Sequence, residues 1–209
     1  MVFAEQGYGD TLMAARFLSQ VKERGGHVTL ECKPELHRLF KTLPADELIT
    51  PQEQAKRTQQ SPNYYDYSIP MMSLMGVFNI TPDTVPPPAQ LHIPDEAKQK
   101  FAFITQQAQN KHKTGIVWSG SLTFKGNDKR ALPLEAFLPL TEDPNTQIYS
   151  LQKGPKAEDL KTSQARPLII DLAPLLEDFA DTAAAIEQLD DVRMTDSSVF
   201  HLAGCLSKP

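Results

Sequence analysis

Three short segments of this 209-residue chain carry residue types that could bind an anion or move a proton. The first is Gly7-Tyr8-Gly9-Asp10, where two glycines precede a predicted helix. Glycines in this place are typical of dinucleotide-binding loops, and a carboxylate such as Asp10 can act as a general base. Leu12 stands where a dinucleotide fingerprint needs its third glycine, which argues against a nicotinamide oxidoreductase. The alternative for Asp10 is that it simply caps the helix through Thr11 and Met13.

The second segment is the polar loop 120–130, which follows a predicted strand and contains Lys125, Asn127, Lys129 and Arg130. Charge-assisted hydrogen bonds from such cations to phosphate oxygens are strong, above all from arginine, so the loop suits a diphosphate. The alternative is a solvated surface loop, and this is the interpretation that we favour for Lys125.

The third segment is the polar turn Asp196-Ser197-Ser198, followed by His201 on the first turn of a predicted helix. A polar turn between a parallel strand and a helix N-terminus is where α/β proteins bind anions and nucleotides. Taken in isolation, the same residues also fit a capped helix with a core histidine.

Apolar extended stretches alternate with helical ones in both halves of the chain, which predicts an α/β fold with two mostly parallel sheets. A helix over 95–111 is expected to bridge two lobes, and the polar stretch 51–62 is expected to form an exposed loop. The expected strands lie within 2–4, 27–32, 47–50, 64–69, 114–119, 147–152, 168–171 and 192–195.

Composition narrows the functional classes. The net charge of -5 argues against a broad nucleic-acid surface, and no apolar run has the length of a membrane span. The chain shows no charged-then-apolar leader, and Cys32 and Cys205 have no metal or redox spacing, so we expect a cytoplasmic protein with reduced, buried thiols. Because the histidines also lack ligand spacing, no metal site is expected. No cofactor is expected either.

Four segments in order resemble glycosyltransferase family 9, the heptosyltransferase-like enzymes, and most closely the subgroup found at the C-terminal end of bacterial tetratricopeptide-repeat proteins. They are EQGYGDTLMAARFL, GIVWSGSLTFKGNDKRALPLEAF, IYSLQKGP, and DFADTAAAIEQLD with TDSSVFHLAG. The resemblance runs from Glu5 to Pro209. It implies two Rossmann-like lobes of GT-B type: an acceptor-side lobe over 1–94 and a nucleotide-sugar (donor) lobe over 95–209.

The same resemblance implies an inverting, metal-independent transfer of a sugar from a nucleotide-diphosphate sugar to an acceptor hydroxyl. Asp10 matches the acidic residue that serves as general base. The residues matching the donor side are expected at the carboxyl ends of strands, bordering one cleft with Asp10. They are Lys129 and Arg130 for phosphate, Gln152 and Lys153 for the nucleoside, and Asp196, Ser197, Ser198 and His201 for the sugar or the diphosphate.

Two departures from the family pattern qualify this expectation. Arg193 lies in a strand that the family keeps apolar, and the chain ends at Pro209, where the family continues. We therefore expect an incomplete donor lobe that is inactive as a transferase and that self-associates or leaves 191–209 poorly ordered or repacked. The alternative is a non-catalytic remnant or interaction module that keeps the fold and some nucleotide affinity.

Overall fold

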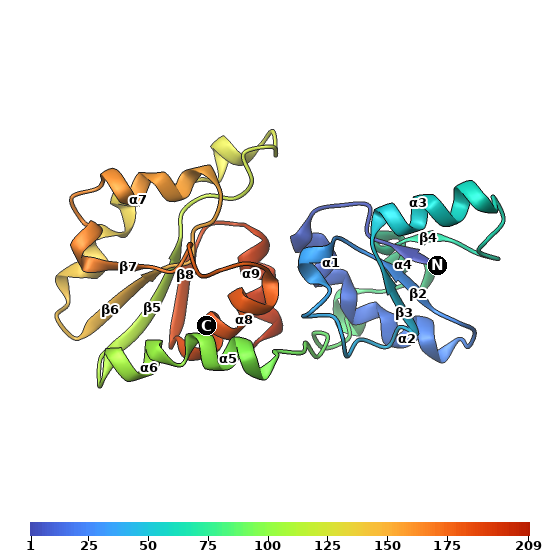
Figure 1. Ribbon diagram of the computed structural model, residues 1–209, viewed down its shortest axis with the longest axis horizontal. Helices are drawn as coiled ribbons and strands as arrows, with labels where there is room; N and C mark the ends of the chain where they lie inside the picture. Colours follow the sequence, from blue (N-terminus) through green and yellow to red (C-terminus); the bar gives the residue numbers. More distant parts are fainter. The chain divides into compact units, whose positions relative to one another are not determined.

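The computed structural model describes residues 1–209, which form two compact units, Met1–His92 and Ile93–Pro209. Each unit contains one four-stranded sheet whose neighbouring strands all run parallel (Figure 1). The predicted α/β fold, with a parallel sheet in each half, is confirmed.

The first unit has the strand order β3-β2-β1-β4. Its strands are β1 Val2–Phe3, β2 Thr29–Glu31, β3 Glu47–Ile49 and β4 Ile69–Pro70. Its α-helices are α1 Tyr8–Ala14, α2 Leu18–Glu23, α3 Pro51–Gln60 and α4 Leu74–Val77, and short 3-10 helices cover Ala15–Phe17, Pro34–Leu36, Met71–Ser73 and Pro82–Thr84.

The stretch 51–62 is not the exposed loop that we predicted, because most of it forms the helix α3. Its N-terminus is a capping box: the Thr50 hydroxyl accepts the Glu53 N–H at 3.2 Å, and the Glu53 carboxylate accepts the Thr50 N–H at 2.7 Å. Its sequence has no apolar stripe, and none of its residues is buried. Arg57 of α3 forms a two-pronged ion pair with Glu47 of β3, which ties the helix to the sheet.

The second unit has the same kind of order, β7-β6-β5-β8. Its strands are β5 His112–Val117, β6 Thr146–Ser150, β7 Ile169–Asp171 and β8 Asp191–Met194. Its α-helices are α5 Asp95–Phe101, α6 Phe103–Ala108, α7 Glu158–Thr162, α8 Phe179–Gln188 and α9 Ser198–Cys205. Its 3-10 helices cover Asn127–Lys129, Leu134–Glu142, Pro155–Ala157 and Arg166–Leu168.

The helix predicted over 95–111 is in fact two helices, α5 and α6, and both belong to the second unit. Helix α6 ends before Gln109, because a φ of 52° at Gln109 is incompatible with a right-handed helix. Strand β5 follows. The helix predicted after Asp178 is confirmed as α8, with the Asp178 carboxylate accepting the Asp181 N–H at 3.0 Å.

Helices cover both faces of the second sheet, as a buried parallel sheet requires (Figure 1). On one face Ile116 and Trp118 belong to an apolar cluster that includes Leu160 of α7. On the other face the Tyr149 hydroxyl donates to the Ile104 carbonyl of α6 at 3.2 Å. Gly115 lies on this second face, where a side chain would come within 2.7 Å of Leu189. Strand β5 is therefore packed on both sides, which fixes the position of the loop that follows it.

The segment 191–209 forms β8 and α9, which differs from poor order, one of the three outcomes that we expected for an incomplete lobe. Self-association and repacking stay predictions. Strand β8 lies at the edge of the sheet, and Arg193 is exposed and donates to the Asp191 carboxylate at 2.7 Å. An edge strand tolerates such a charge, which explains this departure from an apolar pattern. The Val192 N–H of this edge strand donates to the Pro209 carbonyl at 2.9 Å.

The two cysteines differ in environment. Cys32 is buried, and this burial, with the charge of Glu31, raises the pKa of its thiol to about 12. Cys205 is only half-buried, so the expectation of two buried thiols holds for Cys32 alone. No helix of the chain combines the length and the apolar character that crossing a membrane requires.

Candidate functional site

The carboxyl ends of all four strands of the second unit meet at one edge of the sheet, because the strands are parallel. From β5 the chain adds β6 and β7 on one side and then returns to place β8 on the other. This reversal makes a switch point between β5 and β8, where open α/β sheets bind their ligands. The loop after β5 and the turn after β8 contain two of the three segments singled out in the sequence.

An ion pair joins these two segments. The Arg130 guanidinium donates from Nη1 to Oδ2 of Asp196 at 3.0 Å, although the two residues are 66 positions apart in sequence. Arg130 also lies over the ring of Phe124, with 4.2 Å from its guanidinium carbon to the ring centroid. Gly120 permits this packing, since a side chain there would come within 2.9 Å of Arg130 Nη2. The structure thus brings together two of the predicted donor-side residues.

Buried polar atoms without a hydrogen-bond partner gather in the same two segments. Thr195 and Ser197 are 6% and 7% exposed, and neither hydroxyl has a partner. The loop after β5 adds Asn127 Oδ1 and Arg130 Nε. Asn127 itself is held by a hydrogen bond of 3.0 Å from Nδ2 to the Ser119 hydroxyl. Because a buried polar group without a partner is unfavourable by about 1–3 kcal/mol, this set is suited to a polar ligand or to bound water.

Gln152 follows β6 and is 3% exposed. Its Oε1 accepts the N–H groups of Trp118 at 3.1 Å and Ser119 at 2.9 Å. Its Nε2 donates to the carbonyls of Ser119 at 3.0 Å and Lys153 at 2.9 Å. The amide therefore uses its two donors and two acceptor positions on the backbone. This geometry favours a role in holding the end of β5 over a direct contact with a nucleoside.

The remaining predicted donor-side residues are not paired with Arg130 or Asp196. Lys153 donates its ammonium group to the Leu176 carbonyl, in the segment before α8. Lys129 is exposed on the loop after β5. Ser198 is the first residue of α9, and the half-buried His201 lies one turn on, with its ring edge-on to Phe200 at 5.5 Å between centroids.

Asp10 belongs to the first unit, on α1, the helix that follows β1. It is the third residue of that helix rather than its cap, and its Oδ2 accepts the Gly7 N–H at 3.1 Å. The residue is half-buried. Asp10 thus lies next to the carboxyl end of its own sheet. There a second carboxylate, Glu5, accepts the backbone N–H groups of Met71 at 3.0 Å and Met72 at 3.3 Å, which joins the loops after β1 and β4.

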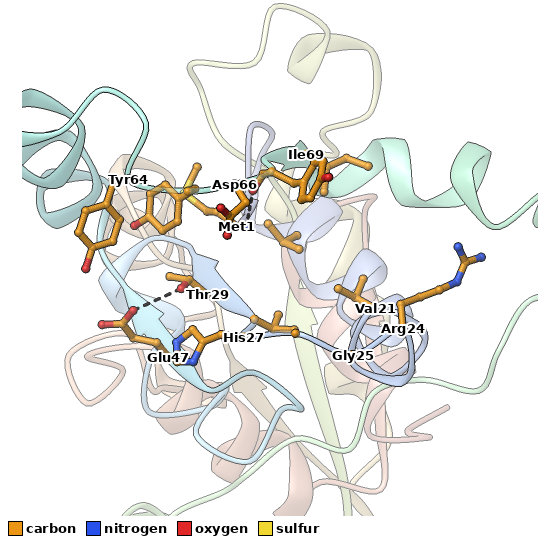
Figure 2. Close-up of a pocket in the computed structure, with 15 residues that line it drawn as sticks. Met1, Val21, Arg24, Gly25, His27, Thr29, Glu47, Tyr64, Asp66 and Ile69 are labelled. Carbon is orange, nitrogen blue, oxygen red and sulfur yellow. Dashed lines mark hydrogen bonds between the residues drawn. The ribbon is translucent and has the colours of Figure 1, made fainter.

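A pocket of about 650 Å³ lies at the opposite, amino-terminal edge of the first sheet (Figure 2). Its wall includes Thr29 and Glu47, at the starts of β2 and β3, and Ile69, at the start of β4. Figure 2 shows His27 beside Glu47 on one side of this pocket and Tyr64 above them. None of the residues predicted for the site lines it, so this pocket and the predicted chemistry are separate.

The sequence did not indicate three features at the carboxyl edge of the second sheet. These are the roles of Ser119 and Thr195 and the burial of Asn127. Ser119 and Thr195 were counted as the last residues of strands. The signal that could have found them is a hydroxyl residue directly after an apolar run, which in a parallel sheet lies at the carboxyl edge.

Comparison with solved structures shows which known proteins share this fold. The E. coli ADP-heptose LPS heptosyltransferase II matches with a TM-score of 0.67 and 13% identity, over 100% of this chain and 82% of that one. The E. coli heptosyltransferase WaaC with ADP-2-deoxy-2-fluoro heptose matches with a TM-score of 0.66 and 12% identity, over 100% and 86%. WaaC with ADP matches with a TM-score of 0.60 and 11% identity, over 100% and 84%. No protein-family model matches the sequence, and no curated protein does. At these identities the likeness establishes a heptosyltransferase-like fold.

Proposed function

We propose that the carboxyl edge of the second sheet binds the diphosphate of a nucleotide sugar, and that the chain's chemistry is sugar transfer to an acceptor hydroxyl. The observation that carries this proposal is the group of buried, unpartnered polar atoms beside Arg130, at the switch point between β5 and β8. The fold adds support, since the similar proteins include a heptosyltransferase solved with ADP and with an ADP-heptose analogue.

The residues divide the reaction between them. Arg130, with Lys129 nearby in the chain, offsets the negative charge of the diphosphate, which grows as the bond from the anomeric carbon to the phosphate oxygen breaks. The hydroxyls of Thr195 and Ser197 donate to the same ligand. Asp10 takes the proton of the acceptor hydroxyl while its oxygen forms the new bond to the anomeric carbon. The products are the glycosylated acceptor and a nucleoside diphosphate, and no metal takes part in the proposed steps.

Donor binding is tested by calorimetry with ADP, GDP, UDP and their sugars. Arg130→Ala should weaken binding of the preferred nucleotide about 10- to 100-fold, since a hydrogen bond to a charged group contributes about 1.5–3 kcal/mol. Arg166→Ala is the matched control: Arg166 is exposed and precedes β7, at the other end of the sheet, so its loss should leave affinity within about twofold. Equal weakening in both variants, or no binding of any nucleotide by the unaltered chain, would contradict the proposal.

The role of Asp10 is tested separately by Asp10→Asn. The amide oxygen can still accept the Gly7 N–H, so the helix start is kept while the base is removed. We expect sugar transfer to fall by about 10²–10⁴-fold with donor affinity nearly unchanged. A loss of donor affinity equal to that of Arg130→Ala would show that Asp10 is not acting as a separate base.

A transfer assay with the unaltered chain and a nucleotide sugar also decides between the two functional classes. Sugar transfer would support the proposed chemistry and would show that the inactivity expected from the sequence is wrong. Nucleotide binding without transfer would favour the non-catalytic alternative, in which the fold serves as a binding module.

A further inference from the structure

The ion pair between Arg130 and Asp196 places a carboxylate on the cation that the proposed function reserves for phosphate. The Arg130 side chain is 25% exposed, whereas the Asp196 side chain is 64% exposed. The guanidinium lies over the Phe124 ring, and a side chain at position 120 would come within 2.9 Å of it. Asp196 is therefore the more exposed partner, and it is the one that an incoming ligand can displace.

A diphosphate that approaches Arg130 meets two unfavourable effects. It must take the place of the Asp196 carboxylate, which accepts the Nη1–H of Arg130 at 3.0 Å. It also brings negative charge next to a displaced carboxylate, and like charges about 4 Å apart repel each other even in water. A ligand escapes both effects only if it also offers Asp196 new hydrogen-bond donors.

We propose that Asp196 is an internal competitor for Arg130, so that the site disfavours a bare diphosphate and favours one that carries hydroxyl groups beside its phosphates. This inference rests on the proposed function and adds a selection between donor and product to it. A nucleotide sugar compensates the displaced carboxylate with sugar hydroxyls, which make charge-assisted hydrogen bonds to it. The nucleoside diphosphate left after transfer has no such groups, and Asp196 returns to Arg130 and promotes its release.

The test is the variant Asp196→Asn in the full chain. Asparagine is neutral and nearly the same size, and its oxygen can still accept the Arg130 N–H, so folding is not at risk. Binding of inorganic pyrophosphate, ADP and ADP-glucose is measured by calorimetry at low salt. We expect pyrophosphate and ADP to bind about three- to tenfold more tightly than to the unaltered chain, because the variant removes an exposed ion pair and a like-charge contact, each of which has a small effect. The preference for ADP-glucose over ADP should shrink.

Asp128→Asn is the matched control. Asp128 is exposed and lies two residues before Arg130. The substitution removes one negative charge, as Asp196→Asn does, but from the loop of Arg130 and without touching the ion pair. Its effect on pyrophosphate affinity should stay within about twofold, because exposed charges are screened by salt. A gain in this control equal to that of Asp196→Asn would show a general charge effect and overturn the competition.

The outcomes separate this inference from the proposed function. Nucleotide binding by the unaltered chain, with unchanged or weaker binding of pyrophosphate in Asp196→Asn, overturns the competition and leaves the function standing. Tighter pyrophosphate binding in Asp196→Asn, with no discrimination between nucleotides and pyrophosphate, supports the competition and contradicts the nucleotide-sugar site. If neither the unaltered chain nor Asp196→Asn binds any of the three probes, the competition and the proposed function are both overturned.

Discussion

The side-chain amide of Gln152 joins the carboxyl ends of β5 and β6 through four hydrogen bonds to backbone groups. Two of its partners belong to Ser119, whose hydroxyl in turn holds Asn127. The loop that carries Arg130 therefore starts from a point fixed by a residue that follows the neighbouring strand β6. A glutamine suits this place because its amide offers two N–H donors and an oxygen that accepts two hydrogen bonds, all in one plane.

At the residue scale we predict that Gln152→Glu destabilises the second unit by about 2–3 kcal/mol. The carboxylate cannot donate to the carbonyls of Ser119 and Lys153, and it places a charge in a buried position. The free energy of unfolding in urea measures this change. Gln147→Glu on β6 is the control, since the half-buried Gln147 makes one hydrogen bond of 3.3 Å. A loss no larger than in this control would mean that the four hydrogen bonds contribute little.

At the scale of elements, α5 is joined to α8 by an ion pair between Lys100 and Asp181. The Asp181 carboxylate is 1% exposed and accepts the Lys100 ammonium at 2.7 Å. We predict that Lys100→Met destabilises the second unit by about 3 kcal/mol, because it leaves a buried charge without its cation. Adding Asp181→Asn should recover part of the loss. Lys161→Met, which removes an exposed pair with Glu158, should have an effect near zero in the same urea titration.

The anchor of α3 predicts a pH effect in the first unit. The hydrogen bond from Arg57 lowers the pKa of the Glu47 carboxyl below its usual value of 4.5, although partial burial opposes this. A lowered pKa in the folded state contributes stability above pH 4.5 that is lost as the pH falls through the folded-state pKa.

Glu47→Gln should therefore reduce the free energy of unfolding at pH 7, and the difference from the unaltered chain should shrink as the pH falls below 4.5. Urea titrations across this range measure the difference. Glu23→Gln, at the end of α2, removes an exposed carboxylate and should show a difference near zero at every pH. A pH-independent difference for Glu47→Gln would exclude the ion pair as its cause.

Secondary structure could be predicted from the sequence where the spacing of apolar residues marks a buried face. The prediction failed where an element buries no residue. Helix α8 was predicted because Asp178 caps it and its apolar residues recur at helical spacing. Helix α3 was missed because it buries nothing, although its Thr50 and Glu53 capping box was present in the sequence. At the site, the strand ends indicated which segments reach the edge. The pairing of Arg130 with Asp196 could not be predicted, since it depends on how two distant loops pack.

At the scale of the whole molecule, each unit has its own sheet and its own core, and the single tryptophan, Trp118, is buried in the second. Its fluorescence should report the unfolding of that unit alone. We predict that Leu30→Ala, in the core of the first unit, leaves the urea midpoint of tryptophan fluorescence unchanged while shifting part of the circular dichroism transition. A Leu→Ala change in a core costs about 2–5 kcal/mol, so the shift is measurable.

Ile148→Ala is the matched change in the second unit and should move the fluorescence midpoint. If Leu30→Ala moves both signals together, the two units unfold as one cooperative body rather than separately.

The strand order has a consequence for the making of the protein. In each unit the first strand pairs with the last one, as Val2 does with Ile69 and Thr114 with Asp191. A ribosome releases the chain from its N-terminus, so the first sheet can close once Pro70 has emerged, while most of the second is still to be made. Until β8 has been synthesised, the backbone groups on one side of β5 have no strand to pair with. The edge that holds Arg130 and Asp196 thus forms only after β8 has emerged, and release of the chain before that point would leave Arg130 without its carboxylate.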